Sequence, residues 1–198
     1  MVQAKVYLPY YIVEVTGKGK RFYGEVHLSL KARWSRILVL ATPRELGFEK
    51  IPLEGIKLDP LARPEEYGRI IEDALIRAEE ITKTTPPFKI KGLRGFLKAM
   101  ITGFKSKTPV TAGPELEAHL ILYYATRALG VMPGDKLRVY PEILWLPVAL
   151  SIEGERVVEA YISTKKMKER FTLLEKFAQE DSEVRTSIVE AVKSWKPL

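Results

Sequence analysis

One stretch of this sequence contains lysine and arginine side chains but no acidic ones, and it is the most obvious chemical feature of the chain. The 34 positions from Ile81 to Pro114 hold seven of them and no Asp or Glu, while the net charge of the whole chain is +7. The remainder of the chain is therefore neutral. A localised excess of positive charge is typical of a surface that binds phosphate groups. We predict phosphate contacts from six of these residues, namely Lys89, Lys91, Arg94, Lys98, Lys105 and Lys107.

Residues 88–107, called the basic segment below, also repeat apolar side chains with helical spacing. At about 100° per residue, a helix over 93–105 collects its large apolar side chains on one broad face. Arg94, Lys98 and Lys105 then follow the edge of that face in a stripe about 40° wide. The remaining side holds only small residues, so either a neighbouring helix or a phosphate backbone could approach it closely.

A second set of polar residues alternates along a predicted strand at 21–30. Arg21, Tyr23 and His27 share one face of that strand, and Lys18 and Lys20 precede it. An aromatic ring can stack on a base while a neighbouring arginine holds a phosphate. Arg21 and Tyr23 are therefore further candidate nucleic-acid contacts, and the alternative is an ordinary solvent-exposed face.

The sequence offers little to a catalytic or metal site. It has no cysteine and only two histidines, His27 and His119, which excludes thiolate chemistry and a histidine-rich metal site. The spacings of P-loops, nucleophile elbows and dinucleotide-binding turns are absent. We predict no catalytic residue, no metal and no cofactor. Four glutamates in or beside predicted hairpins nevertheless leave a metal-dependent nuclease as a third hypothesis: Glu14, Glu25, Glu142 and Glu153.

The strands that would position these groups are predicted in two hairpins. Residues 4–15 are apolar on both faces, as in a central strand, and a glycine-rich turn joins them to 21–30. A third strand is predicted at 36–41, and the second hairpin is formed by 136–150 and 156–163. Residues 7–29 and 145–163 share an aromatic-Leu-Pro opening and a glycine turn. They are either a duplicated unit with pseudo-two-fold symmetry or two hairpins that are alike by chance.

Helices are predicted at 64–83, at 114–129 and, as a pair, at 165–195. The helix at 114–129 is apolar nearly all round and is expected to be largely buried. Thr164 and Ser182 are the predicted caps of the last two helices, the first of which turns Met167 and Phe171 inward. The chain is therefore predicted to be a single α+β domain over 1–198. Its largely antiparallel sheet is built from β-hairpins and covered by about four to five helices.

The composition also indicates the growth temperature and the cellular location that we expect for this protein. The chain lacks asparagine, has two glutamines and is rich in Lys, Glu and Arg, which is typical of proteins from hot environments. The longest apolar run, at 143–150, is too short to span a bilayer, and we expect a cytoplasmic protein. The first hypothesis is a non-catalytic nucleic-acid-binding protein of a thermophilic cell, with DNA and RNA both open. The second is a protein–protein interaction module or homo-oligomer subunit that uses the small-residue side of the helix at 93–105 and the apolar helix at 114–129.

Overall fold

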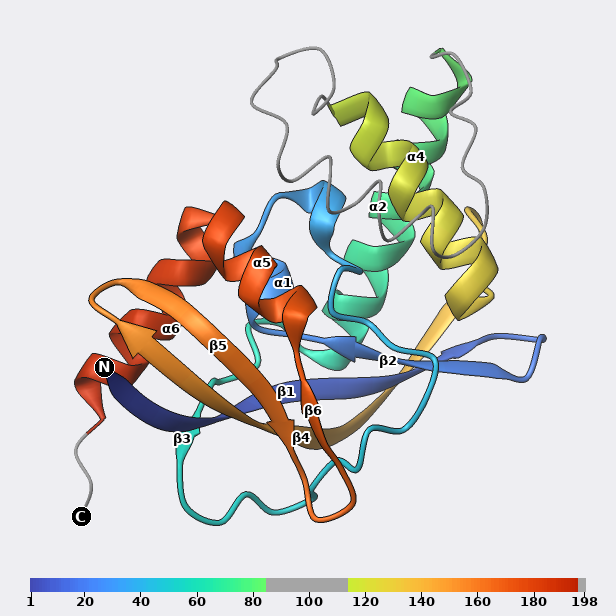
Figure 1. Ribbon diagram of the computed structural model, residues 1–198. Coiled ribbons are helices and arrows are strands. Elements are labelled where there is room, and N and C mark those ends of the chain that lie inside the picture. Colours follow the sequence, from blue (N-terminus) through green and yellow to red (C-terminus); the bar gives the residue numbers. More distant parts are fainter. Residues whose placement is uncertain (85–113, 196–198) are drawn as a thin grey trace.

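The N-terminal strand β1 (Val2–Val15) lies at the centre of the sheet, as its two apolar faces predict. The computed structural model describes residues 1–84 and 114–195, in which the strand order is β2-β1-β4-β5-β6 (Figure 1). The pairs along this path are antiparallel, and the short β3 (Ile56–Lys57) adds a parallel contact to β1. The other strands are β2 (Lys20–Glu25), β4 (Leu137–Glu153), β5 (Arg156–Ser163) and β6 (Lys168–Arg170).

Two helical layers cover the sheet and bury different faces of β1. Its side chains from Ala4 to Tyr10 at even positions pack with α5 (Thr172–Glu180) and α6 (Ser182–Ser194). Its side chains from Tyr11 to Val15 at odd positions pack with α2 (Pro64–Lys83) and α4 (Pro114–Tyr124). Successive strand residues point to opposite faces, so the two helical layers lie on opposite faces of β1, one toward each end. The α+β class is confirmed.

The two hairpins lie side by side in the sheet, where β1 of the first pairs with β4 of the second. Leu8 pairs with Leu146, Tyr7 with Pro147 and Pro9 with Trp145, so the two aromatic-Leu-Pro segments lie directly opposite one another. The β1–β2 and β4–β5 hairpins are thus related by a local two-fold axis between the two leucines. Beyond the hairpins this symmetry ends, because β2 leads into the short helix α1 (Leu28–Lys31) whereas β5 leads into β6 and α5.

The predicted strand at 21–30 is wrong in its second half. The strand β2 ends at Glu25, and the chain then turns into α1. The fully buried Glu25 carboxylate accepts hydrogen bonds from the backbone N–H groups of His27 and Leu28, both at 3.0 Å, and of Ser29 at 2.7 Å. Three backbone donors that converge on one side chain fix a tight turn, which a regular strand cannot provide.

The predicted strand at 36–41 is also wrong, although its residues are buried as expected. A 3-10 turn, η1 (Trp34–Arg36), is followed by further turns through Ala41. Local bonds from the N–H of Val39 to Arg36 and of Ala41 to Leu38 replace the pairing of a strand. Two buried or half-buried tyrosines bind the remaining carbonyls: Tyr10 donates to Leu40 and Tyr124 to Ala41.

The last two helices begin at other residues than the sequence predicts. The Thr164 hydroxyl accepts from the N–H groups of Lys166 and Met167, which makes a turn into β6 rather than a helix cap. Helix α5 therefore starts at Thr172, and Phe171 precedes it. The cap of α6 is Asp181, whose carboxylate accepts from the N–H groups of residues 183 and 184, and Ser182 is the first helical residue.

The helix predicted at 114–129 is present but is less completely buried than expected. The α-helix ends at Tyr124, a π-helical turn, η2 (Ala125–Leu129), continues it, and Gly130 ends it at a φ of 71°. Leu120, Ile121 and Leu129 are buried, as predicted. Four other large side chains of this helix, which we also expected to be buried, are only partly covered, namely Leu116, Leu122, Tyr123 and Tyr124.

One arginine joins the two helical layers through the irregular segment between them. Arg36 of η1 lies 3.2 Å from a carboxylate oxygen of Glu117 in α4 and 3.8 Å from one of Asp181, the cap of α6. Ser35 adds a hydrogen bond to Glu117. These side chains are mostly buried, so the ion pairs are protected from solvent screening and orient α4 and α6 relative to the sheet.

Glu25 gives the fold a specific pH dependence. Burial raises the pKa of this carboxyl from 4.5 to about 7, against the opposing effect of the three backbone donors. The folded protein therefore binds more protons than the unfolded chain between these values, and the free energy of unfolding should fall as pH rises through this window. The Glu25→Gln variant cannot ionise at this position. The free energy of unfolding of the wild type, measured relative to that of this variant, should therefore decrease by up to about 3 kcal/mol across this pH window. Urea unfolding of both proteins from pH 4 to 8 measures it.

The exposed Glu155, also replaced by Gln, is the matched control, because its side chain is 80% exposed. This variant should follow the wild-type pH profile. If Glu25→Gln also follows it, Glu25 does not titrate in this range.

Candidate nucleic-acid interface

The six cations of the basic segment proposed as phosphate contacts lie outside the described residues, as does the predicted helix at 93–105. In the sequence they stand between the end of α2 at Lys83 and the start of α4 at Pro114, two helices that pack side by side (Figure 1). Residues 85–113 and 196–198 together hold seven of the 32 Lys and Arg and none of the 25 Asp and Glu. The residues that the structure describes are therefore electrically neutral as a set.

Arg21 and Tyr23, the two remaining candidates, lie on β2, but their surroundings differ from each other. The Tyr23 ring packs against Phe48, with ring centroids 5.0 Å apart, and its backbone pairs with Thr42. The loop at 42–48 thus partly covers Tyr23, which is half-buried. Arg21 is more open, since its side chain is 58% exposed. The structure therefore does not place Arg21 and Tyr23 together as one stacking pair.

The aromatic partner of Arg21 is Tyr140 of β4. Arg21, Glu14 and Arg138 form a row across three strands, because Glu14 pairs with Arg21 on one side and with Arg138 on the other. The Arg21 and Arg138 guanidinium groups each lie 5.2 Å from the centre of the Tyr140 ring. We call these four residues the arginine–tyrosine row. Its side chains point away from α2 and α4, because the neighbouring Val13, Phe22 and Val139 face those helices.

Hydrogen bonds hold the row in one arrangement. The Tyr140 hydroxyl donates to Glu14 at 2.7 Å and accepts from Arg21 at 3.2 Å, while Arg21 also donates to Glu14 at 2.9 Å. The hydrogen bond from Tyr140, followed by that from Arg21, lowers the pKa of Glu14, and the Glu14 carboxylate in turn raises the pKa of Arg21. The row is thus a fixed cluster of two guanidinium groups, one carboxylate and one phenol, with one positive charge in excess.

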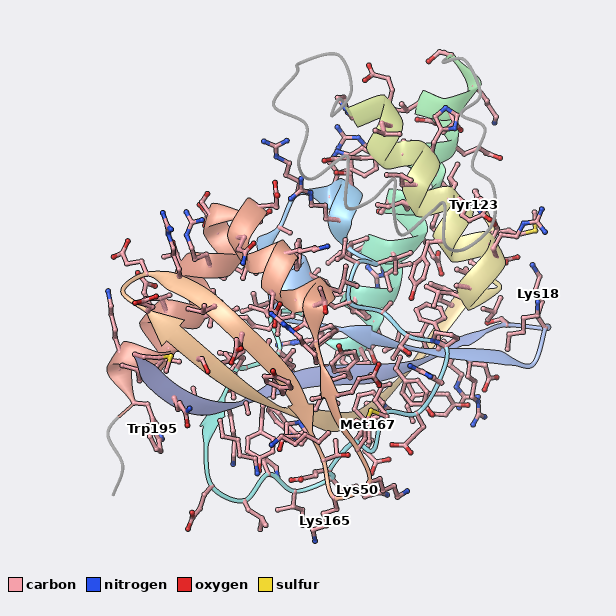
Figure 2. The ribbon with its side chains drawn as sticks, in the orientation of Figure 1. Lys18, Lys50, Tyr123, Lys165, Met167 and Trp195 are labelled. Carbon is pink, nitrogen blue, oxygen red and sulfur yellow. The ribbon has the colours of Figure 1, made fainter. Side chains whose placement is uncertain are left out.

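The tip of the β1–β2 hairpin adds cations, most of which have carboxylate partners. Lys18 extends from the tip (Figure 2) and lies 2.7 Å from Asp135, whose pKa this contact lowers. Lys136 lies 2.8 Å from Glu72 of α2. The Lys20 side chain lies against Gly130, where a Cβ atom would clash with it. Apart from Arg138 and Lys20, the cations around the row are therefore already neutralised locally.

Arg138 and Tyr140 were not among the residues predicted from the sequence, although the sequence contains a pattern that indicates them. Arg138 and Tyr140 occur as Arg-Val-Tyr, which repeats the pattern of Arg21-Phe22-Tyr23. Both tripeptides place an apolar residue in the core between an outward Arg and an outward Tyr. What the pattern alone does not reveal is that the two strands flank Glu14.

The four glutamates considered for a metal site are dispersed. Glu14 belongs to the arginine–tyrosine row, Glu25 binds backbone N–H groups, Glu142 lies 2.9 Å from Lys50, and Glu153 ends β4. Within residues 1–84 and 114–195, no three carboxylates or histidines come close enough to hold a metal ion.

The hydrogen bond between Tyr140 and Glu14 can be tested by titration. Tyr140→Phe removes the donor that lowers the Glu14 pKa most, so this pKa should rise toward 4.5. Arg138→Ala should raise it less, because Arg138 acts only through its charge. The measurement is a carbon-detected NMR titration of the glutamate carboxyl groups. An unchanged Glu14 in Tyr140→Phe would show that this hydrogen bond does not form in solution.

Comparison with known proteins returned no relative. No protein-family model matches this sequence, and no curated protein or solved structure is detectably similar to it. In the part of the chain that the structure describes, no helix is both long enough and apolar enough to cross a membrane.

Proposed function

We propose that this protein binds nucleic acid without catalysing a reaction on it, through phosphate contacts from the basic segment. The observation that carries the proposal is the separation of charge along the chain. The described residues contain equal numbers of cationic and anionic side chains, whereas the segment between α2 and α4 contains cations alone. Most of the net positive charge of the chain is therefore concentrated in one stretch of the sequence, which favours attraction of a polyanion.

The ion pairs elsewhere in the protein strengthen this argument. Lys18, Lys136 and Arg170 each lie within 3.0 Å of a carboxylate oxygen, and similar pairs occur on several elements. A surface that only needed to be soluble at high temperature would mix the two signs in this way. Thirty-four consecutive positions without an acid depart from that pattern and favour an external polyanion as the partner.

Nucleic acid suits this segment better than an anionic membrane surface. The basic segment has no tryptophan to anchor it at a lipid interface, and Gly95 and Gly103 weaken an isolated amphipathic helix. Phosphate contacts of this kind carry no base specificity, so binding should depend on salt and little on sequence. Arg21, with Arg138 beside it, offers further contacts on the exposed sheet face, while Tyr23 is partly occupied by Phe48.

An interaction module or homo-oligomer subunit is the second candidate. It is favoured by the apolar side chains of α4 that remain partly exposed, including Leu116 and Leu122. Light scattering coupled to size exclusion separates this candidate from the first. A monomer at micromolar concentration would weaken it, and a stable dimer that lacks nucleic-acid affinity would favour it.

The basic segment is tested with a triple variant, Arg94→Ala, Lys98→Ala and Lys105→Ala. Each lost duplex contact should flatten the slope of log affinity against log salt by about 0.9. Affinity should fall to a similar extent for unrelated sequences. Mobility shift and fluorescence anisotropy with single- and double-stranded DNA and RNA, at several salt concentrations, measure both quantities.

A second triple variant controls for the loss of three positive charges. Lys50→Ala, Lys166→Ala and Lys193→Ala removes three exposed lysines that have carboxylate partners. It should keep wild-type affinity and slope, and melting curves should show that both triple variants are folded. If the wild type binds none of the four nucleic acids at low salt, the proposed function is wrong. If the first triple variant binds like wild type, the basic segment is not the contact surface.

A further inference from the structure

A histidine, a serine and a backbone carbonyl are aligned on the side of the molecule formed by α1 and α6. His27 follows the last residue of β2 by two positions, and Ser187 lies in the middle of α6. The Nε2 atom of His27 is 2.7 Å from the Ser187 hydroxyl oxygen, and its Nδ1 atom is 2.6 Å from the carbonyl oxygen of Asp59. Both distances are short for hydrogen bonds of these types.

The protonation of the imidazole follows from these partners. A backbone carbonyl can only accept a hydrogen bond, so Nδ1 must carry the proton. Burial lowers the pKa of His27, which keeps the ring neutral and leaves Nε2 as an acceptor. The Ser187 hydroxyl therefore donates to Nε2. This is the arrangement of a nucleophile, a general base and an orienting group.

The imidazole is held in place from its own backbone as well. The N–H of His27 donates to the buried Glu25 carboxylate, and His27 is only 9% exposed. The ring is thus fixed by hydrogen bonds at its backbone and at both ring nitrogens.

A cavity of about 370 Å³ opens onto the pair and is lined by both His27 and Ser187. Lys31 and Lys57 contribute the positive charges of its lining, and Glu183 and Glu190 of α6 contribute negative ones, together with Asp59. The volume is within the range of small-molecule sites. Mixed charges around a small hollow suit a short neutral ester better than a polyanion.

We propose that Ser187 is a nucleophile activated by His27, and that this cavity accepts a small neutral carboxylic ester. The Ser187 oxygen bonds to the ester carbonyl carbon while its proton moves to Nε2 of His27. The carbon–alkoxide bond then breaks, and the alkoxide leaves as an alcohol with the proton from Nε2. Water, deprotonated by the same nitrogen, releases the acid from Ser187 and restores the starting state. Lys31 and Lys57 are the cavity groups that can stabilise the transient oxyanion.

This inference is independent of nucleic-acid binding and is tested with a fluorophosphonate, which bonds covalently to activated serine hydroxyls. The purified protein should be labelled on the peptide that contains Ser187, as identified by mass spectrometry. His27→Gln should slow labelling about a hundredfold or more, because the general base is lost. The pH profile of labelling should rise through the lowered pKa of His27.

Ser194 provides the matched control, because it lines the same cavity from the same helix but donates to the Ala191 carbonyl instead of a histidine. Ser194→Ala should be labelled at the wild-type rate, whereas Ser187→Ala should not be labelled. Turnover of p-nitrophenyl acetate should follow the same order. A wild-type protein in which the Ser187 peptide stays unlabelled, or labelling that is equal in His27→Gln, would overturn the proposal without depending on the folding of the serine variants.

Discussion

The structure depends on a central strand pair that must be buried on both faces. β1 and β4 run alongside each other from Val2–Ile152 to Val15–Leu137, and their middle residues, including Val6, Leu8 and Leu146, have almost no exposed surface. A single helical layer can cover only one face of such a pair. The remaining chain therefore supplies two layers, α5 with α6 and α2 with α4, at opposite ends of the strands. The irregular segment at 34–41 lies between them. Its Arg36 forms ion pairs with Glu117 of α4 and with Asp181, the cap of α6.

This division separates two kinds of surface. Where a helical layer ends, part of the sheet remains open, and there the sequence places charged residues in fixed pairs, as in Arg21 with Glu14. These pairs leave little net charge on the described surface. Six of the seven excess positive charges stand in the connection between α2 and α4, and the seventh is Lys196. The histidine–serine pair lies in the layer formed by α5 and α6, toward the opposite end of the central strands from α2 and α4.

Sequence patterns predicted the parts of this fold that rest on long, regular repeats. The long apolar run in 4–15 and the helical period in 64–83 extend over enough residues to outweigh local exceptions, and both elements are present. Two of the failures occur where one side chain redirects the backbone. Glu25 ends β2 by binding three N–H groups, and Thr164 makes a turn where a helix cap was expected.

The candidate sites show the same limit. The cationic character of 88–107 is a property of the sequence, whereas the partners of Arg21 depend on strand register. His27, Asp59 and Ser187 are separated by 32 and 128 positions, and no spacing rule connects them. The docking of α6 beside α1 brings Ser187 to His27, and the chain that follows β3 brings the Asp59 carbonyl to the other side of the ring.

The register of the central pair also bears on how the chain folds during synthesis. Leu8 and Leu146 are 138 positions apart, so β1 leaves the ribosome long before the strand that covers its inner edge exists. Until then β2 protects one edge of β1, while the other edge and two apolar faces remain available to other chains. Pairing over so long a separation closes a large loop and is intrinsically slow. The protein is therefore most exposed to aggregation in the period before β4 pairs with β1, and it is the formation of β4, rather than of any helix, that ends this exposure.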